Sequence, residues 1–144
     1  MTVAKHIARF RVRPLAGSPR WFGVRIYAKK ADMLATAHAE GALEGDFKAA
    51  FATSGTTLHH HIGDIFLFSN PDLRKDAVHE LCHAACYYVR YYRRGDLSPS
   101  LSENGATEAE ELLCEVMEHV VCAFSVELLK RERRMKRLLA QIPQ

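Results

Sequence analysis

A histidine, a glutamate and a second histidine stand at H-E-x-x-H spacing in the segment His79-Glu80-Leu81-Cys82-His83. On a helix, residues i and i+4 lie one turn apart on the same face, so both imidazoles can direct a ring nitrogen at one ion. Two neutral imidazoles bind zinc, and Glu80 beside them can accept a proton from a zinc-activated water. With eight histidines in 144 residues, a chance match has odds of roughly 3 in 100. The elements around the motif therefore have to support it.

A buried strand is expected directly before the motif. Asp64 to Phe68 form a short apolar run, followed by the turn-forming residues Ser69, Asn70 and Pro71. Asn70 or Ser69 is expected to cap a helix, with Pro71 at its first position and its end near Arg93. The apolar stripe of this helix is expected to comprise Ala77, Leu81, Ala85, Tyr88 and Tyr92, with His79, His83 and Cys86 on a neighbouring face.

The first part of the chain predicts strands. Residues 8–14 and the run Trp21 to Tyr27 alternate between polar and apolar side chains, which indicates a strand pair. Lys30 to Ala39 form an Ala-rich segment that ends before Gly41 and indicates a short helix. Phe47 to Ala52 fits either a strand or a helical turn. The run His59-His60-His61 fits a loop or a strand end, and its consecutive histidines cannot all face one ion.

A second, longer helix is expected to begin at a capping box, Thr107 to Glu110, and to extend as far as Leu139. From Lys130 onward it is basic and expected to be exposed. Its buried stripe is expected to comprise Leu113, Met117, Val120 and Phe124.

A catalytic zinc needs a third protein ligand besides the two histidines. A metzincin would supply a histidine six residues after His83, but Val89 stands there. The start of the second helix offers four carboxylates instead. Glu110 belongs to the capping box and Glu108 lies at the frayed end, whereas Glu111 shares a face with the fourth, Glu115.

From Ile62 to Phe124 the chain resembles the gluzincin metallopeptidases, in which H-E-x-x-H on one helix is completed by a glutamate on the next. It looks most like the small phage-type or ImmA/IrrE-like minimal zincins. The resemblance implies zinc ligands His79, His83 and Glu111, with Glu80 as general base and acid. Glu115 would orient a ligand histidine. Where the family usually has Ala or Ser, this chain has Cys114.

No residue is assigned by the family pattern to stabilise the transition state, and His119 is a candidate by its position in the sequence alone. The resemblance also implies the fold, an α+β zincin-like domain spanning residues 1–144. In it a small mixed sheet of three to four strands packs on the motif helix and the long C-terminal helix. A basic helical extension is expected from about residue 130.

The function expected from this resemblance is that of a zinc-dependent metalloendopeptidase-like hydrolase acting on a peptide or protein substrate. By the same family analogy, the strand at Asp64 to Phe68 would hold an extended peptide by backbone pairing if it forms an edge facing the cleft. The alternative is a non-catalytic module of the same fold that binds a protein or nucleic-acid partner. Nucleic acid would bind through Lys130 to Arg137, but such a basic run is more often a solvated face. A third interpretation of the motif is a polar network between two helices that binds no metal.

The composition fits a globular protein, since 48% of the residues are hydrophobic and 26% are charged, with a net charge of +3. The four cysteines form no C-x-x-C pair, which favours a reducing compartment. Cys82 and Cys86 are expected to behave as small hydrophobic side chains. There is no continuous apolar stretch of about 18 residues. We therefore expect a cytoplasmic protein without a membrane span.

Overall fold

A computed structural model describes residues 5–41, 44–55, 59–95, 97 and 107–143. The alternating segments near its start form β1 (His6–Val12) and β2 (Trp21–Tyr27), which pair antiparallel as expected. The Ala-rich segment forms α1 (Lys30–Ala39), with the predicted bounds. Of the two interpretations of the region around residue 50, the strand is confirmed, as β3 (Ala50–Thr53).

The sheet has four strands in the order β1-β2-β4-β3. β4 (His61–Phe68) runs parallel to β2 and antiparallel to β3. It is three residues longer than the predicted strand, because its pairing with β2 extends back to His61. The peptide-binding role expected for Asp64 to Phe68 required this strand to form an edge of the sheet. This prediction is wrong, since β4 lies inside the sheet and the edge nearest the motif helix is β3.

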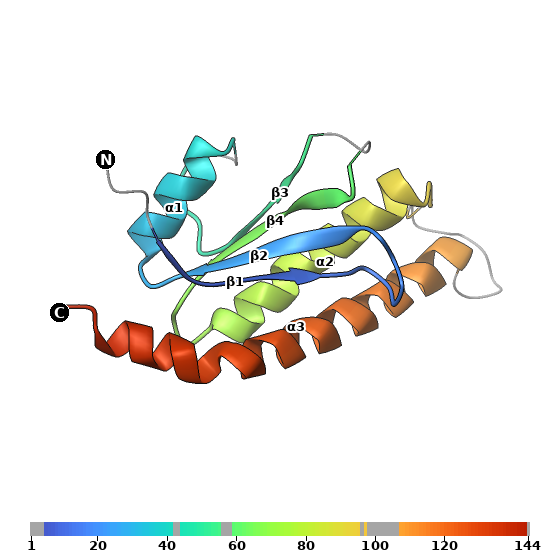
Figure 1. The fold of residues 1–144 in the computed structure, drawn as a ribbon. Coiled ribbons are helices and arrows are strands. Elements are labelled where there is room, and N and C mark those ends of the chain that lie inside the picture. Colours follow the sequence, from blue (N-terminus) through green and yellow to red (C-terminus); the bar gives the residue numbers. More distant parts are fainter. Residues whose placement is uncertain (1–4, 42–43, 56–58, 96, 98–106, 144) are drawn as a thin grey trace.

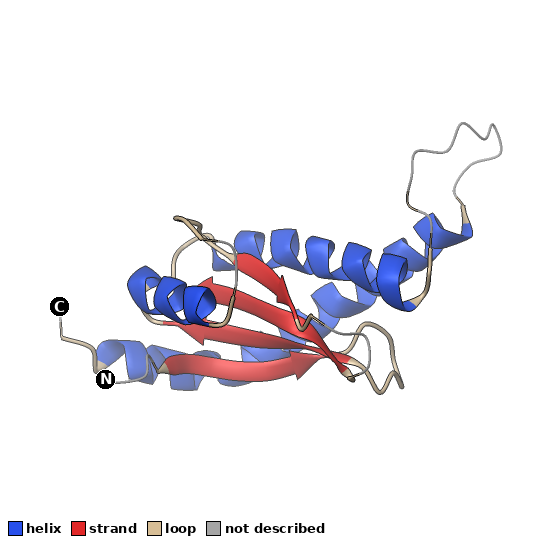
Figure 2. Ribbon diagram, turned by 90° about the horizontal axis from the view of Figure 1, so that it is seen from above, coloured by secondary structure: helices blue, strands red, loops and turns tan. Residues whose placement is uncertain are grey.

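Two helices cover one face of the sheet and a third lies on the other (Figures 1 and 2). The motif helix is α2 (Leu73–Tyr92), and the long C-terminal helix is α3 (Glu108–Ala140). The main core lies between these two helices and the sheet. Large side chains from the sheet and from both helices are almost fully buried there, among them Phe22, Ile65, Leu81 and Val120. α1 closes a smaller core with Tyr27 and Phe66. The result is a mixed α/β fold with a four-stranded mixed sheet and three helices.

The start of α2 differs from the prediction by two residues. Leu73 is its first residue, so Pro71 lies in the turn before the helix. The Asn70 side chain does accept a hydrogen bond, from the backbone N–H of Asp72 at 2.9 Å, but this closes a local turn and caps no helical turn. The Leu73 N–H donates to the Asn70 carbonyl at 3.1 Å, so residues 70–73 form a tight turn, and the helix begins with the bond from the Asp76 N–H to the Asp72 carbonyl at 2.9 Å.

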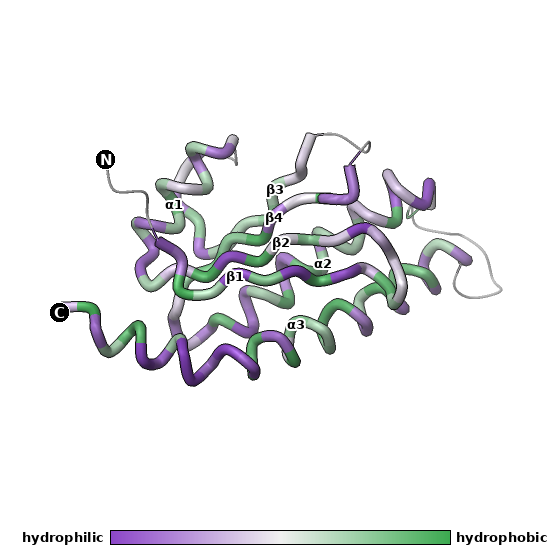
Figure 3. The backbone as a smooth tube through the Cα atoms, in the orientation of Figure 1, coloured by the Kyte–Doolittle hydropathy of each residue, from purple (hydrophilic) through white to green (hydrophobic). Residues whose placement is uncertain are grey.

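The start of α3 is as predicted. The Glu110 N–H donates to the Thr107 hydroxyl, and the Thr107 N–H donates to the Glu110 carboxylate, both at 3.2 Å. Val120 and Phe124 of the expected stripe are buried, whereas Leu113 and Met117 are only partly buried. Hydrophilic residues dominate the last third of the helix (Figure 3).

Candidate metal centre

His79 and His83 lie one turn apart on the exposed side of α2, as their spacing requires. Their Nε2 atoms are 3.2 Å apart, and their ring planes meet at 75°. Without an ion, one ring N–H donates to the other ring nitrogen. Tetrahedral zinc with Zn–N bonds of about 2.0 to 2.1 Å separates two ligand nitrogens by about 3.3 Å. The two imidazoles therefore already stand at the spacing that one zinc ion needs.

Glu80 lies on the buried side of α2, next to the edge strand β3. Its residue is only 8% exposed, and its carboxylate accepts a hydrogen bond from the backbone N–H of Phe51 in β3. Burial raises the pKa of Glu80, while His83, His79 and the Phe51 N–H act in the opposite direction. A carboxylate whose pKa is raised in this way is better suited to accept and return a proton near neutral pH.

A cleft of about 680 Å³ lies between α2 and β3, and both Glu80 and His83 line it. Ser54 N–H donates to the Ile62 carbonyl across the β3–β4 ladder. In an antiparallel ladder such bonds use alternate residues, so the N–H and C=O groups of Phe51 and Thr53 point outward from the sheet. The cleft is therefore bordered by the outer edge of β3, where the Phe51 N–H already donates to Glu80, with Tyr87 and Tyr91 on its α2 side.

A second hollow, of about 280 Å³, adjoins the cleft at Glu80 and contains His79, Asp76 and Lys48. One Asp76 carboxylate oxygen is buried without a hydrogen bond, and the Lys48 ammonium lies 3.9 Å from it. Lys48 is held more closely by Asp72, at 2.9 Å. The sequence analysis missed these two residues. Asp76 could have been found, because it lies one turn before Glu80 on the same helix.

The structure does not bring Glu111 to the histidine pair. α2 and α3 run antiparallel, with Arg74 paired to Glu132 near one end and Gly95 close to Ala109 near the other. At a rise of 1.5 Å per residue, Glu111 lies roughly 15 to 18 Å along α3 from the level of His83. Within the described part of the chain, no three His, Cys, Asp or Glu side chains gather closely enough to hold a metal ion. The assignment of Glu111 as third ligand stays a prediction.

Another carboxylate of α3 lies closer, measured along the helix axis, to the level of the histidines. Glu118 follows Glu111 by two helical turns on the same face and is exposed. By the same helical rise it lies roughly 5 to 8 Å along α3 from the level of His83. The family spacing pointed to Glu111 and gave no reason to weigh Glu118. The antiparallel register of α2 and α3, which the sequence does not fix, makes Glu118 a candidate for the third ligand.

Glu115 and His119 occupy other parts of α3. Glu115 is exposed and belongs to no group of potential metal ligands. His119 lines a hollow of about 390 Å³ beside β1, together with Arg11 and Arg13. That hollow shares no residue with the cleft at Glu80. The roles expected for Glu115 and His119 stay predictions.

Cys86 lines the cleft one turn beyond His83, and Cys82 precedes it by one turn. Burial raises the pKa of the Cys86 thiol, and Cys82 raises it further. A thiol with a raised pKa is a poor metal ligand, because the metal binds the thiolate. Cys82 is exposed, so of the two only Cys86 approaches the expected buried character.

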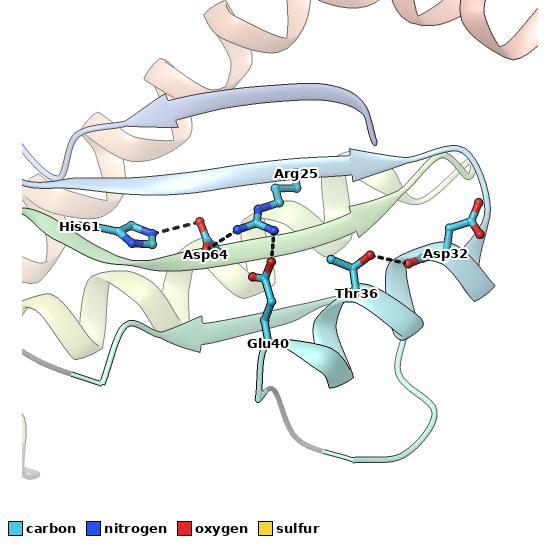
Figure 4. Close-up of polar contacts among 6 residues, drawn as sticks. All are labelled: Arg25, Asp32, Thr36, Glu40, His61 and Asp64. Carbon is cyan, nitrogen blue, oxygen red and sulfur yellow. Dashed lines mark hydrogen bonds and ion pairs between the residues drawn. The ribbon is translucent and has the colours of Figure 1, made fainter. Parts of the chain in front are cut away.

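A second polar cluster lies on the opposite face of the sheet (Figure 4). The Asp64 carboxylate accepts from Arg25 and from the His61 ring, both at 3.0 Å, and Arg25 also pairs with Glu40 of the α1 end. The Trp21 ring stacks on His61 with centroids 4.3 Å apart. Gly23 makes room for Asp64, since a Cβ at this position would lie 1.9 Å from an Asp64 carboxylate oxygen.

Comparison with known protein families, with curated proteins and with solved structures found no match for this chain. In the described segments, no helix combines the length and the apolar character needed to cross a membrane.

Proposed function

We propose that this protein is a zinc-dependent hydrolase of peptide bonds with a zincin-like fold. The observation that carries the proposal is the spacing of the His79 and His83 ring nitrogens, 3.2 Å, beside a buried carboxylate that opens onto a cleft. Zinc is the metal expected for two imidazoles, and His79 and His83 would hold it together with a carboxylate of α3.

The chain's own residues supply the proton chemistry. A zinc ion bound there would act as a Lewis acid on a water and on a carbonyl group. Glu80 would accept the proton of the attacking water and return it to the leaving amine. Its burial favours this role, because the neutral acid formed in the first step is stabilised relative to the charged form.

The edge of β3 supports a peptide as the substrate. The outward N–H and C=O of Thr53 and the outward C=O of Phe51 border the cleft that contains Glu80, whereas the Phe51 N–H already donates to Glu80. An extended peptide would pair with them as an added strand, so that main-chain hydrogen bonds hold it beside the carboxylate. The sequence suggested this role for Asp64 to Phe68, and because β4 is an interior strand and β3 an edge strand, the proposal assigns it to β3.

Zinc binding is the first test. We expect the purified protein to bind one zinc per chain, and His79→Ala with His83→Ala to remove the metal because too few ligands remain. His59→Ala is the matched control, since it removes an exposed histidine outside the motif. Stoichiometric zinc in the double variant would refute the metal centre.

Hydrolysis is the second test. With zinc bound, Glu80→Gln is expected to retain the metal but to slow cleavage of an unstructured protein by about 10² to 10⁴-fold, since the amide accepts no proton. Glu132→Gln is the control, because it removes a carboxylate charge outside the cleft and the adjoining hollow. A wild-type protein that binds zinc and cleaves nothing would favour the alternative, a non-catalytic binding module.

The third ligand is tested by zinc titration of Glu111→Gln, Glu115→Gln, Glu118→Gln and His119→Gln. The family resemblance predicts the largest loss of affinity for Glu111, and a loss of roughly 10 to 100-fold for Glu115 if it acts through a ligand. The register of α2 and α3 predicts the largest loss for Glu118 instead. His119 serves as the control, because it lies beside β1.

A further inference from the structure

A further pocket lies where β1 begins, α1 begins and α3 ends (Figure 1). This is the opposite end of the fold from Tyr87 and Tyr91 of the Glu80 cleft. The volume of this further pocket is about 510 Å³, within the range of roughly 300 to 1,000 Å³ usual for small-molecule sites. It shares no residue with the cleft that contains Glu80. Whatever binds here is therefore independent of the proposed zinc chemistry.

The lining of this pocket is strongly positive. Among the described residues, five cations and one carboxylate line it, the cations being Lys5, Arg9, Lys29, Arg131 and Arg134. Arg131 is already paired with Glu127. Within the segments that the structure describes, the other four form no ion pair with a carboxylate. Such a concentration of uncompensated cations around a hollow favours an anionic ligand.

The floor of the pocket is apolar. Ile7 and Ala8 of β1 contribute to it from one side, and Leu138 and Ile142 from the end of α3 contribute from the other. A purely inorganic anion would leave this surface in contact with water. A ligand with an apolar or aromatic body would cover it and gain roughly 25 cal/mol per Å² of apolar surface buried.

The single carboxylate, Asp32, lies in the first turn of α1. Figure 4 shows its carboxylate turned away from the Arg25 cluster. The Thr36 hydroxyl donates to the backbone carbonyl of Asp32 and not to its carboxylate. Within a ring of cations, a carboxylate oxygen is placed to accept a hydroxyl or amino group of a ligand. This adds a polar donor to the chemistry that the pocket requires.

We propose that this pocket binds an organic phosphate of the nucleotide class. The phosphate contacts Lys5, Arg9, Lys29 and Arg134, an aromatic body covers the floor formed by β1 and α3, and a ligand hydroxyl donates to Asp32.

His6 provides a direct reporter of occupancy, because its ring lines the pocket. Burial lowers the pKa of His6, and the charges of Arg9, Arg25 and Lys5 lower it further. A bound phosphate offsets these positive charges, so the pKa of His6 is expected to rise when the ligand binds. Adventitious binding elsewhere on the basic surface leaves it unchanged.

The test uses the full chain with adenosine monophosphate, and with adenosine and inorganic phosphate as the two partial ligands. Calorimetry is expected to show binding of the nucleotide at least about tenfold tighter than of either part. Arg134→Glu is expected to weaken nucleotide binding by about tenfold or more, through loss of a charge-assisted contact. Arg133→Glu is the matched control, since it changes the charge equally at an exposed neighbour outside the pocket.

Three results would overturn the proposal. The nucleotide fails to bind, or it binds no better than inorganic phosphate, which means that the apolar floor contributes nothing. The third result is that Arg133→Glu weakens nucleotide binding as much as Arg134→Glu, as expected for binding to a diffuse basic surface. An oligonucleotide that binds more tightly than the nucleotide, with equal sensitivity to both substitutions, identifies such a surface. Both positions are exposed, so both variants are expected to fold, and thermal unfolding checks this.

Discussion

Two polar clusters of this protein lie on opposite faces of the same sheet and differ in how their charges are paired. In the cluster around Asp64, each charged group has a partner of the other sign or a ring that stacks on it. Burial opposes the charge of Arg25, but the hydrogen bond with Glu40 and the charge of Asp64 outweigh it and raise the pKa of Arg25. The ion pairs of this cluster are complete without any ligand, although the buried Nε–H of Arg25 has no hydrogen-bond partner in the described part of the chain.

The cluster around Glu80 is incomplete by the same measure. Its buried carboxylate has a backbone N–H as a partner but no Lys or Arg, and its two histidines face solvent with their nitrogens converging. A satisfied buried network stabilises a fold, whereas convergent ligands and a buried carboxylate with a raised pKa suit a group that is still to bind. The comparison therefore assigns a structural role to the first cluster and supports a functional role for the second.

The largest effect on stability is expected from breaking the complete cluster. Asp64→Ala leaves the Arg25 guanidinium, whose side chain is 14% exposed, without its buried partner, and should lower the free energy of unfolding by about 3 to 5 kcal/mol. Urea unfolding of the metal-free protein measures it. Glu40→Gln is the control, because Glu40 is exposed and should cost less than about 1 kcal/mol. Equal losses in the two variants would contradict a buried role for Asp64.

A smaller loss is expected from Gly23→Ala. The added methyl group would overlap the Asp64 carboxylate, so either Asp64 or the strand must move. Overpacking of this kind costs about 1 to 3 kcal/mol. Gly17→Ala tests the site dependence, since nothing lies within 4 Å there and only its φ of 75° opposes a side chain. A variant Gly23→Ala as stable as the wild type would show that Asp64 is loosely held.

How far each cluster could be predicted from sequence depends on the distance over which its residues act. The His79–His83 pair needs only a helix, so local periodicity sufficed to place both rings on one face. The capping box of α3 was predictable for the same reason. Asp64 and Arg25 meet because β2 and β4 are parallel neighbours, a pairing that no local pattern specifies. The same limit applies to the third zinc ligand, because the register of α3 against α2 depends on packing along both helices.

A pH-dependent effect is expected from Glu80→Gln in the metal-free protein. Because burial raises the pKa of Glu80, the folded state binds its proton more tightly than the unfolded state, whose carboxyl has the ordinary pKa of 4.5. Stability from this group is thus fully present below pH 4.5 and falls as the pH rises through the higher folded pKa. The amide does not titrate, so the variant should gain stability over the wild type across that window.

Urea unfolding of both proteins between pH 4 and pH 8 measures the difference. Asp76→Asn is a useful comparison, because Asp76 also raises the pKa of Glu80 and its removal should reduce the pH dependence in part. A difference between wild type and Glu80→Gln that is constant with pH would mean that the Glu80 carboxylate is solvated in the folded protein.

The smallest effect on stability is expected from the histidines that define the proposed metal centre. Both rings are exposed, so His79→Ala and His83→Ala should each change the free energy of unfolding of the metal-free protein by no more than about 0.5 kcal/mol. His61→Ala is the matched test on the other face, where the ring stacks on Trp21 and donates to Asp64. It should lose about 1 to 2 kcal/mol. If the α2 variants lost as much as His61→Ala, the pair would be a structural contact, and the zinc interpretation would lose its main physical support. If only zinc-loaded protein shows the loss, the two histidines stabilise the fold through the metal alone, as ligands do.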